Sequence, residues 1–237
     1  MVRISESGEL PDQSDMELMS AYLPLQQGDL LELGCGTAQT TRDLANRFPG
    51  SRWIATEVDQ VQHEKNLALN GLANLIFQSG GMQQIDLPNA SIDAVIMLKS
   101  LHHVSVDQMD SGFQELHRVL RQGGLVYISE PVYAGDFNQI LRLFNDEKQV
   151  REQAFAAIQR AIESGLFELD REVHFQSLSR YEGFADFEQR VLGVTHSNYD
   201  LNDSLLASVK SAFSPHVDVY GIAEFHNPMR VDILRKI

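Results

Sequence analysis

The stretch Leu30–Ala45, LLELGCGTAQTTRDLA, runs from apolar residues into closely spaced glycines and then into a helix-like pattern. Glycines permit a tight turn that brings backbone close to a ligand. Two phosphate-binding patterns fit this loop poorly. A loop for nucleoside triphosphates needs Gly-Lys-Ser/Thr, which does not match here. A dinucleotide loop needs a small residue three positions after its second glycine, and counting from Gly34 and Gly36 that residue is Gln39.

A third pattern fits the loop better. It is an acidic residue followed by small residues at alternate positions, Glu32-Leu33-Gly34-Cys35-Gly36-Thr37-Ala38. Such glycines let backbone lie flat against a nucleoside and an amino-acid tail, with no pyrophosphate to hold. The sequence therefore predicts a ligand site at this loop. The expected contacts come from Glu32, Gly34, Cys35, Gly36 and Thr37.

Further polar residues follow two predicted strands, and two of them are candidate catalytic bases. A histidine side chain can accept a proton near neutral pH, which makes His102 and His103 the candidates. Adjacent histidines that open a helix are also common as structural residues, and His103 fits that alternative better. Glu130 either anchors a substrate or caps a strand, and Lys99 either receives a substrate carboxylate or lies along the surface.

The elements that must position these residues alternate between strands and helices. Strand-like runs are Leu30–Leu33, Arg52–Val58, Leu75–Gln78, Ile92–Leu98 and Leu125–Glu130. Helix-like runs are Asp15–Leu23, Thr40–Arg47, Gln60–Asn70 and Asp107–Arg121, with Gln122-Gly123-Gly124 as the stop after the last. This alternation predicts a parallel sheet covered on both faces, whose ligand sits at the carboxyl ends of the strands.

After Pro131 the alternation ceases. Ala134–Leu169 is mainly helical in pattern, and helices are also expected over Tyr181–Leu192 and Leu201–Phe213. Two strand runs, Val217–Phe225 and Met229–Leu234, are separated by His226-Asn227-Pro228, which predicts an antiparallel hairpin. Inserted helices above strand ends suit a substrate lid, and a fixed helical cover is the alternative.

The loop is followed in order by the acid Glu57, the stretch Gly81–Asp93 and the run Leu101-His102-His103-Val104. Together they resemble the class I S-adenosylmethionine-dependent methyltransferases that act on small molecules. The resemblance is strong over residues 28–131 and implies S-adenosylmethionine as cofactor. It places Glu57, at the end of the second strand, on the two ribose hydroxyls, with Asp59 as the alternative. It also places Val58, Gly81, Met82 and Lys99 beside the cofactor, although Gly81 replaces the acidic residue common at the adenine. Met82 is equally well explained as a core residue.

The fold expected is therefore an α/β, doubly wound, mostly parallel seven-stranded sheet with a C-terminal antiparallel hairpin and a helical insertion after the fifth strand. We expect one methyltransferase domain over residues 1–237. Its parts are a cofactor-binding core at 28–131, a helical insertion and possible lid at 134–200, and a terminal hairpin at 215–237.

The composition limits the classes of partner and cofactor that we expect the protein to bind. The formal net charge of −14 opposes nucleic-acid binding, and neither a signal peptide nor a membrane span is evident. The single cysteine excludes an intramolecular disulfide and a cysteine metal site, and no metal is expected. We therefore predict a cytoplasmic enzyme that transfers a methyl group to oxygen or nitrogen of a small molecule. A protein methyltransferase and a non-catalytic S-adenosylmethionine-binding module are the alternatives.

Overall fold

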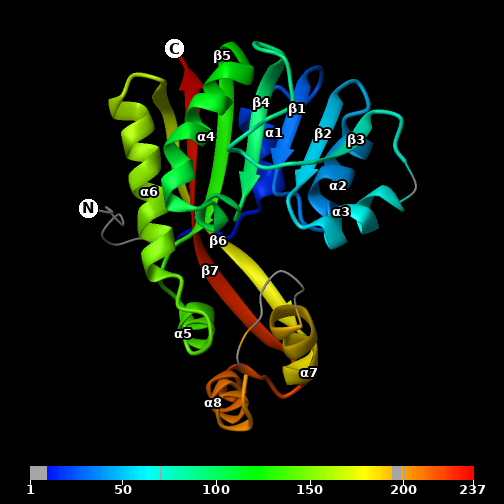
Figure 1. The fold of residues 1–237 in the computed structure, drawn as a ribbon. Coiled ribbons are helices and arrows are strands. Elements are labelled where there is room, and N and C mark those ends of the chain that lie inside the picture. Colours follow the sequence, from blue (N-terminus) through cyan, green and yellow to red (C-terminus); the bar gives the residue numbers. More distant parts are fainter. Residues whose placement is uncertain (1–9, 70, 194–198, 200) are drawn as a thin grey trace. The chain divides into compact units, whose positions relative to one another are not determined.

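The computed structural model describes residues 10–69, 71–193, 199 and 201–237, and Figure 1 shows their helices and strands. The chain divides into two compact units. The core unit comprises Asp15–Glu130, Lys148–Val173 and Arg230–Ile237. The accessory unit comprises Met1–Ser14, Pro131–Glu147 and His174–Met229.

One seven-stranded sheet has the order β3-β2-β1-β4-β5-β7-β6, and its strands β1 to β4 lie entirely in the core unit. Strands β1 to β5 pair in parallel, and the C-terminal strands are antiparallel, as the sequence predicted. The chain builds the sheet outward from β1 through β2 to β3, then returns to β4 on the other side of β1. In sheets with such a reversal, ligands bind at the carboxyl ends of the strands beside it, which here are β1 and β4. The strands are β1 (Asp29–Leu33), β2 (Arg52–Glu57), β3 (Leu75–Ser79), β4 (Ile92–Leu98), β5 (Leu120–Pro131), β6 (Phe167–Tyr181) and β7 (Ala223–Lys236).

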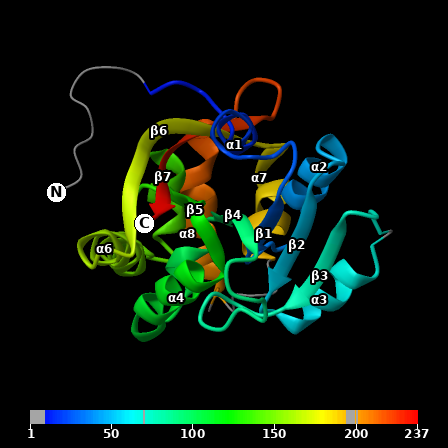
Figure 2. The same cartoon turned by 90° about the horizontal axis from the view of Figure 1, so that it is seen from above.

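Helices lie on both faces of this sheet. Helices α1 (Asp15–Tyr22) and α2 (Gln39–Arg47) lie on one face, and α4 (Val106–Val119) and α6 (Lys148–Glu163) on the other (Figure 2). The second face holds the main hydrophobic core, in which side chains of β1, β4 and β5 pack with those of α4 and α6. Helix α3 (Gln60–Leu67) connects β2 to β3. Within the described ranges no helix is long and apolar enough to cross a membrane.

Most predicted elements of the core unit are found within a few residues. The strand predicted over Ile92–Leu98 has those limits, and the helix predicted over Asp107–Arg121 runs from Val106 to Val119. The residues Gln122-Gly123-Gly124 lie inside β5 rather than after a helix end. They form an irregularity where β5 shifts its register against β4, and Gly123 adopts a φ of 74° there. The end of the helix predicted at Asn70 lies outside the described residues.

The sequence predicts the turn of the C-terminal hairpin at the wrong residues. Residues 226–228 are not a turn but lie inside β7, which continues from Ala223 to Lys236. The Asn227 side chain donates to the Ser177 carbonyl at 3.0 Å, and the Pro228 carbonyl accepts from the Val132 amide at 2.9 Å, so the chain stays extended. The second C-terminal strand is β6, over residues for which the sequence analysis predicts no strand.

The accessory unit has a separate aromatic core. Helices α5 (Asp136–Leu141), α7 (Gly183–Phe187) and α8 (Asp203–Phe213) contribute to it, with the π-helical turn η2 (Glu188–Leu192) and the 3₁₀ turn η3 (Ser214–His216) nearby in the chain. Phe137 stacks on Tyr181 with ring centroids 6.1 Å apart, and Phe187 and Phe213 lie 4.9 Å apart. The apolar residues at helical spacing in this part of the sequence are therefore core residues.

Candidate active site

The glycine loop connects β1 to α2 and is tied to β2. The amides of Gly34 and Cys35 both donate to the Thr56 carbonyl, at 3.0 and 2.9 Å. Gly34 has a φ of 73°, and a Cβ atom there would lie 2.8 Å from the Cβ of Ser100. Glycine is thus required at this position both by the backbone conformation and by the close approach of the segment after β4.

Gly36 presents the open side of the loop. Its φ is 53°, and a Cβ atom built on it would meet no atom of the described chain within 4 Å. Ala38, which follows, also adopts a left-handed conformation, with a φ of 57°. A surface of bare backbone facing open space fits a flat ligand laid against the loop, which is the geometry that the sequence pattern predicted.

Glu57 fastens the end of β2 to this loop. One carboxylate oxygen, Oε2, accepts from the Gly36 amide at 2.7 Å. The other, Oε1, accepts from the amides of Val58 and Asp59 at 2.8 and 3.0 Å. The side chain is buried, so these bonds fix its orientation. A carboxylate has about four acceptor positions, so these three bonds leave one position on Oε2 that can receive a hydroxyl beside Gly36.

Asp59 has a different task. It is the N-cap residue of α3, and its Oδ1 atom accepts from the Val61 amide at 2.9 Å. An aspartate in this position satisfies an amide that the helix itself leaves without a partner. The acid of this pair that holds the glycine loop is Glu57, which the sequence comparison had placed at the ribose.

Two residues of the predicted motif are turned into the protein. Glu32 is 3% exposed and accepts a hydrogen bond from the Thr41 hydroxyl of α2. Burial raises the pKa of Glu32 to about 7, and the negative charges of Asp15 and Glu57 act in the same direction. Burial likewise raises the pKa of the Cys35 thiol to about 12, so this thiol stays protonated and unreactive. Thr37, in contrast, is exposed.

The residues predicted at the adenine are split between surface and core. Val58 is 58% exposed, and a Cβ atom on Gly81 would lie 2.9 Å from its Cγ1 atom, so these two residues adjoin. The Met82 side chain is buried and packs against Gly112 of α4. Its apolar surface is therefore used inside the core. The parts of the protein that an adenine ring can contact here are the exposed Val58 side chain and the backbone around Gly81.

The end of β4 carries an unusual backbone conformation. Lys99 is exposed and has a φ of 54°, in the left-handed region that non-glycine residues rarely occupy. Its amide donates to the Ser129 carbonyl at 2.7 Å, and the Ser100 hydroxyl donates to the Leu33 carbonyl at 2.9 Å. Strained conformations of this kind cluster at functional sites, and this one turns the chain into the 3₁₀ helix η1 (Leu101–His103) beside the glycine loop.

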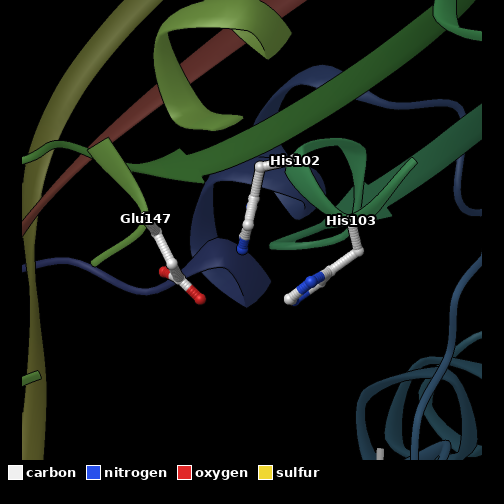
Figure 3. Close-up of side chains that lie close together, drawn as sticks. All are labelled: His102, His103 and Glu147. Atoms are coloured by element: carbon white, nitrogen blue, oxygen red, sulfur yellow. The ribbon is translucent and has the colours of Figure 1, made fainter. Parts of the chain in front are cut away.

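His102 and Glu130 form a pair at the ends of adjacent strands. The Nδ1 atom of His102 is a hydrogen-bond partner of Glu130 Oε2, while Glu130 Oε1 accepts from the Leu101 amide at 2.8 Å. His102 is buried and His103 is exposed, and their ring centroids are 4.1 Å apart (Figure 3). With Nδ1–H donating to the carboxylate, the Nε2 atom of His102 carries the lone pair and can accept a proton.

The sequence analysis does not predict the pairing of His102 with Glu130. It predicts Glu130 as a strand cap or a substrate anchor, whereas the hydrogen bonds of Glu130 go to η1. Since β4 and β5 are adjacent and parallel, residues just beyond their carboxyl ends meet. Tyr133, three residues after Glu130, belongs to the accessory unit, where its hydroxyl donates to Asp146 at 2.8 Å.

Comparison with known proteins agrees with this geometry. Residues 30–124 match the family described as methyltransferase domain. A malonyl-[acyl-carrier protein] O-methyltransferase of Hahella chejuensis is 32% identical over 101 residues, 43% of this chain and 36% of that protein. A sterol 24-C-methyltransferase of Yarrowia lipolytica is 26% identical over 114 residues, 46% of this chain and 29% of that protein. The chain thus spans well under two thirds of the length of either relative.

The fold is shared more widely than the sequence. A candidate methyltransferase of Bacillus halodurans C-125 superposes with a TM-score of 0.63 at 15% identity, over 94% of this chain and 99% of that one. The fold and the glycine loop define a class I, Rossmann-like protein. Residues 30–124 match the methyltransferase domain family, and this segment contains the glycine loop, Glu57 and η1.

Proposed function

We propose that this protein is an S-adenosylmethionine-dependent methyltransferase that acts on oxygen or nitrogen of a small molecule. The observation that carries the proposal is the open glycine loop held by Glu57: the Gly36 amide is bound at 2.7 Å, and no described atom occupies the space in front of Gly36. The match of residues 30–124 to the methyltransferase domain supports the same cofactor.

The residues present fit that cofactor. Backbone at Gly34 and Gly36 would lie against its amino-acid tail and ribose, and the Glu57 carboxylate would accept from the ribose. Val58 and the backbone of Gly81 and Met82 would border the adenine. When bound, S-adenosylmethionine supplies a methyl group on a sulfonium, which needs little further activation. The protein's main contributions are then alignment of the acceptor and exclusion of water.

A protonated acceptor needs a base, and His102 is the residue we assign to that task. The Glu130 carboxylate is a partner of Nδ1, and we assign Nε2 as the ring atom that receives the proton from an O–H or N–H group. Glu130 itself is a positioning residue, because it acts through the imidazole and through the Leu101 amide. His103 is exposed beside His102 and is the second candidate.

Two features favour a small acceptor. By their names, the two relatives above act on a sterol and on malonyl-[acyl-carrier protein]. The net charge of −14 disfavours nucleic acid, although it is compatible with a basic protein tail. We place the enzyme in the cytoplasm, as the sequence predicts. A module that binds the cofactor without turnover remains the competing function, and only an assay separates it from an enzyme.

Calorimetry with S-adenosylmethionine, S-adenosylhomocysteine and NAD tests the cofactor. We expect both sulfur nucleosides to bind and NAD not to bind, because the loop lacks the small third residue of a dinucleotide site. Tighter binding of NAD would overturn the assignment. A screen of small metabolites with methyl-labelled cofactor then tests turnover. A basic peptide as the best acceptor would reject the small-molecule part, and binding without transfer to any acceptor would favour the non-catalytic module.

A further inference from the structure

We propose that Asn66 is a positioning residue that holds the glycine loop in its ligand-ready conformation. The inference rests on the proposed function, because the ligand concerned is S-adenosylmethionine. Its structural basis is one juxtaposition. The Asn66 side-chain amide donates a hydrogen bond to the carbonyl of Gly36, and the Gly36 amide donates to the Glu57 carboxylate.

The contacts of Asn66 fit a residue that holds the glycine loop in place, and we call these contacts the clamp. The residue lies on α3 and is 1% exposed. Its Nδ2 atom donates to the Gly36 carbonyl at 2.7 Å and to the Cys35 sulfur at 3.5 Å. Its Oδ1 atom accepts from Gln62 Nε2 at 2.8 Å, which fixes the orientation of the amide. A buried asparagine is a poor core residue unless its hydrogen bonds are made, and here both ends of the amide are bonded.

Gly36 is consequently held on both sides by one segment. Glu57 ends β2 and Asn66 lies on the helix that follows, so the β2–α3 segment binds both the amide and the carbonyl of this glycine. Gly36 has a φ of 53°, and besides Glu57 and Asn66 the Cys35 thiol contacts its carbonyl, with an S–O distance of 3.8 Å. Fixing a loop in its bound conformation removes an ordering cost from ligand binding.

A second asparagine provides a matched control. Asn74 also uses Nδ2 to tie a loop, donating to the carbonyls of Ala45 and Ser51 at 3.0 Å each. Ala45 lies in the last turn of α2 and Ser51 directly precedes β2, away from the glycine loop. If hydrogen bonds from asparagine side chains to loop carbonyls matter only for folding, substitutions at Asn66 and Asn74 will have similar consequences. If Asn66 positions the loop, only its substitution will affect ligand binding.

The decisive variant is Asn66→Asp, which preserves shape and replaces the donor by a titratable oxygen. An ionised carboxylate repels the Gly36 carbonyl, whereas a protonated one can donate to it. We expect the Kd for S-adenosylhomocysteine at pH 8 to rise roughly 10- to 100-fold, the scale for losing a hydrogen bond and gaining repulsion. Lowering the pH towards 5 should restore affinity. Asn74→Asp should keep the wild-type Kd throughout.

Other ionisable groups lie near the clamp, so each Kd is expressed relative to wild type at the same pH. They are Glu57 on β2, Glu32 on β1, Cys35 in the loop and His63 on α3. Because all of them are present in both proteins, the ratio isolates the substituted side chain. A ratio that stays near one from pH 5 to pH 8 would overturn the proposal.

Hydrogen exchange of the ligand-free protein separates this proposal from the proposed function. Amides of residues 34–38 should exchange faster in Asn66→Asp than in wild type at pH 8, while those of Asn74→Asp should not. If wild type fails to bind S-adenosylhomocysteine but the exchange difference is present, the clamp stands and the cofactor assignment fails. Equal exchange in both proteins would reject the clamp. Should Asn66→Asp not fold, Asn66→Ser is measured by the same exchange test.

Discussion

The Glu130 carboxylate contacts both the imidazole of His102 and the amide of Leu101, although 28 positions separate Glu130 from His102 in the chain. The pair sits at the ends of β4 and β5, beside the reversal in strand order that opens the site. One carboxylate thereby fixes both the start of η1 and the ring that η1 carries. A rigidly held imidazole of this kind is what proton transfer in a defined direction requires.

The first prediction concerns this pair. His102→Gln should lower kcat by about 10²- to 10⁴-fold, the usual contribution of a general base, with little change in the Kd for S-adenosylhomocysteine. Glu130→Gln should lower kcat less and alter its pH profile, because the ring remains but loses its anionic partner. Steady-state kinetics with an acceptor found by screening provides the measurement. His103→Gln is the control, and a larger loss there than at His102 would exchange the two roles.

The second prediction separates the two acids after β2. Glu57→Ala should weaken cofactor binding by roughly 1.5–3 kcal/mol, the scale for losing hydrogen bonds to a charged acceptor. Asp59→Ala should leave binding nearly unchanged and cost about 1 kcal/mol of stability, because Asp59 caps α3. Calorimetry and urea unfolding on the same samples measure both quantities. A large loss of affinity in Asp59→Ala with none in Glu57→Ala would show that the ribose acid had been misassigned.

These two acids also show how far the sequence alone could go. It located the loop, the strand and the pair Glu57 and Asp59, because hydrophobic runs and glycine spacing are local signals. It left the pair unresolved, since both acids follow the same strand. The N-cap role of Asp59, immediately before Gln60, was available from cap preferences and would have favoured Glu57. The clamp by Asn66 was not accessible, because it depends on how α3 packs against the loop.

The missed strand β6 has a different cause. Its apolar residues Phe167, Leu169, Val173 and Phe175 recur at even spacing, which indicates a strand. The charged residues between Leu169 and Val173 and the helical pattern before them obscured it. In β7, Asn227-Pro228 looks like a turn because proline lacks an amide donor. Only the bonds from Asn227 to Ser177 and from Val132 to Pro228 explain why the chain stays extended there.

The third prediction follows from the buried Glu32. Burial raises its pKa from 4.5 to about 7, so the folded protein binds this proton more tightly than the unfolded chain does. The corresponding stability is fully present below about pH 4.5 and is lost as the pH rises to about 7, beyond which the loss is constant. The difference is on the order of 3 kcal/mol.

Glu32→Gln removes this titration while retaining an oxygen that can accept from the Thr41 hydroxyl. Urea unfolding of both proteins at intervals from pH 4.5 to pH 8 measures the effect. The difference in free energy of unfolding, variant minus wild type, should increase with pH and level off above about pH 7. A difference that is independent of pH would show that Glu32 titrates normally.

The fourth prediction tests the open side of the loop. Gly36→Val would place a branched side chain in the space before the loop and would strain a backbone with a φ of 53°. We expect binding of S-adenosylhomocysteine to be abolished while far-ultraviolet circular dichroism remains native, because no described atom clashes with the new Cβ. Retained binding would mean that the ligand does not approach the loop at Gly36.

The last prediction concerns the segment Ala134–Leu169, which the sequence suggests as a mobile lid. The structure divides it at Glu147 and Lys148, inside the polar interruption Asn145-Asp146-Glu147-Lys148. Helix α6 belongs to the core unit, where Ala154, Ala157, Ile158 and Ala161 are buried with α4 and β5. A helix anchored in that way cannot move freely, so we restrict the lid proposal to residues 134–147.

Hydrogen exchange distinguishes the two halves directly. Amides of α6 should exchange slowly with or without ligands, because opening them requires disrupting the main core. Amides of residues 134–147 should exchange rapidly in the free protein and more slowly in the complex with S-adenosylhomocysteine and an acceptor, since closure of a lid protects its amides. The cofactor product alone is the control, and it should protect residues 134–147 less than the ternary complex does. Identical exchange of these residues in the free and ternary states would leave a static cover in place of a lid.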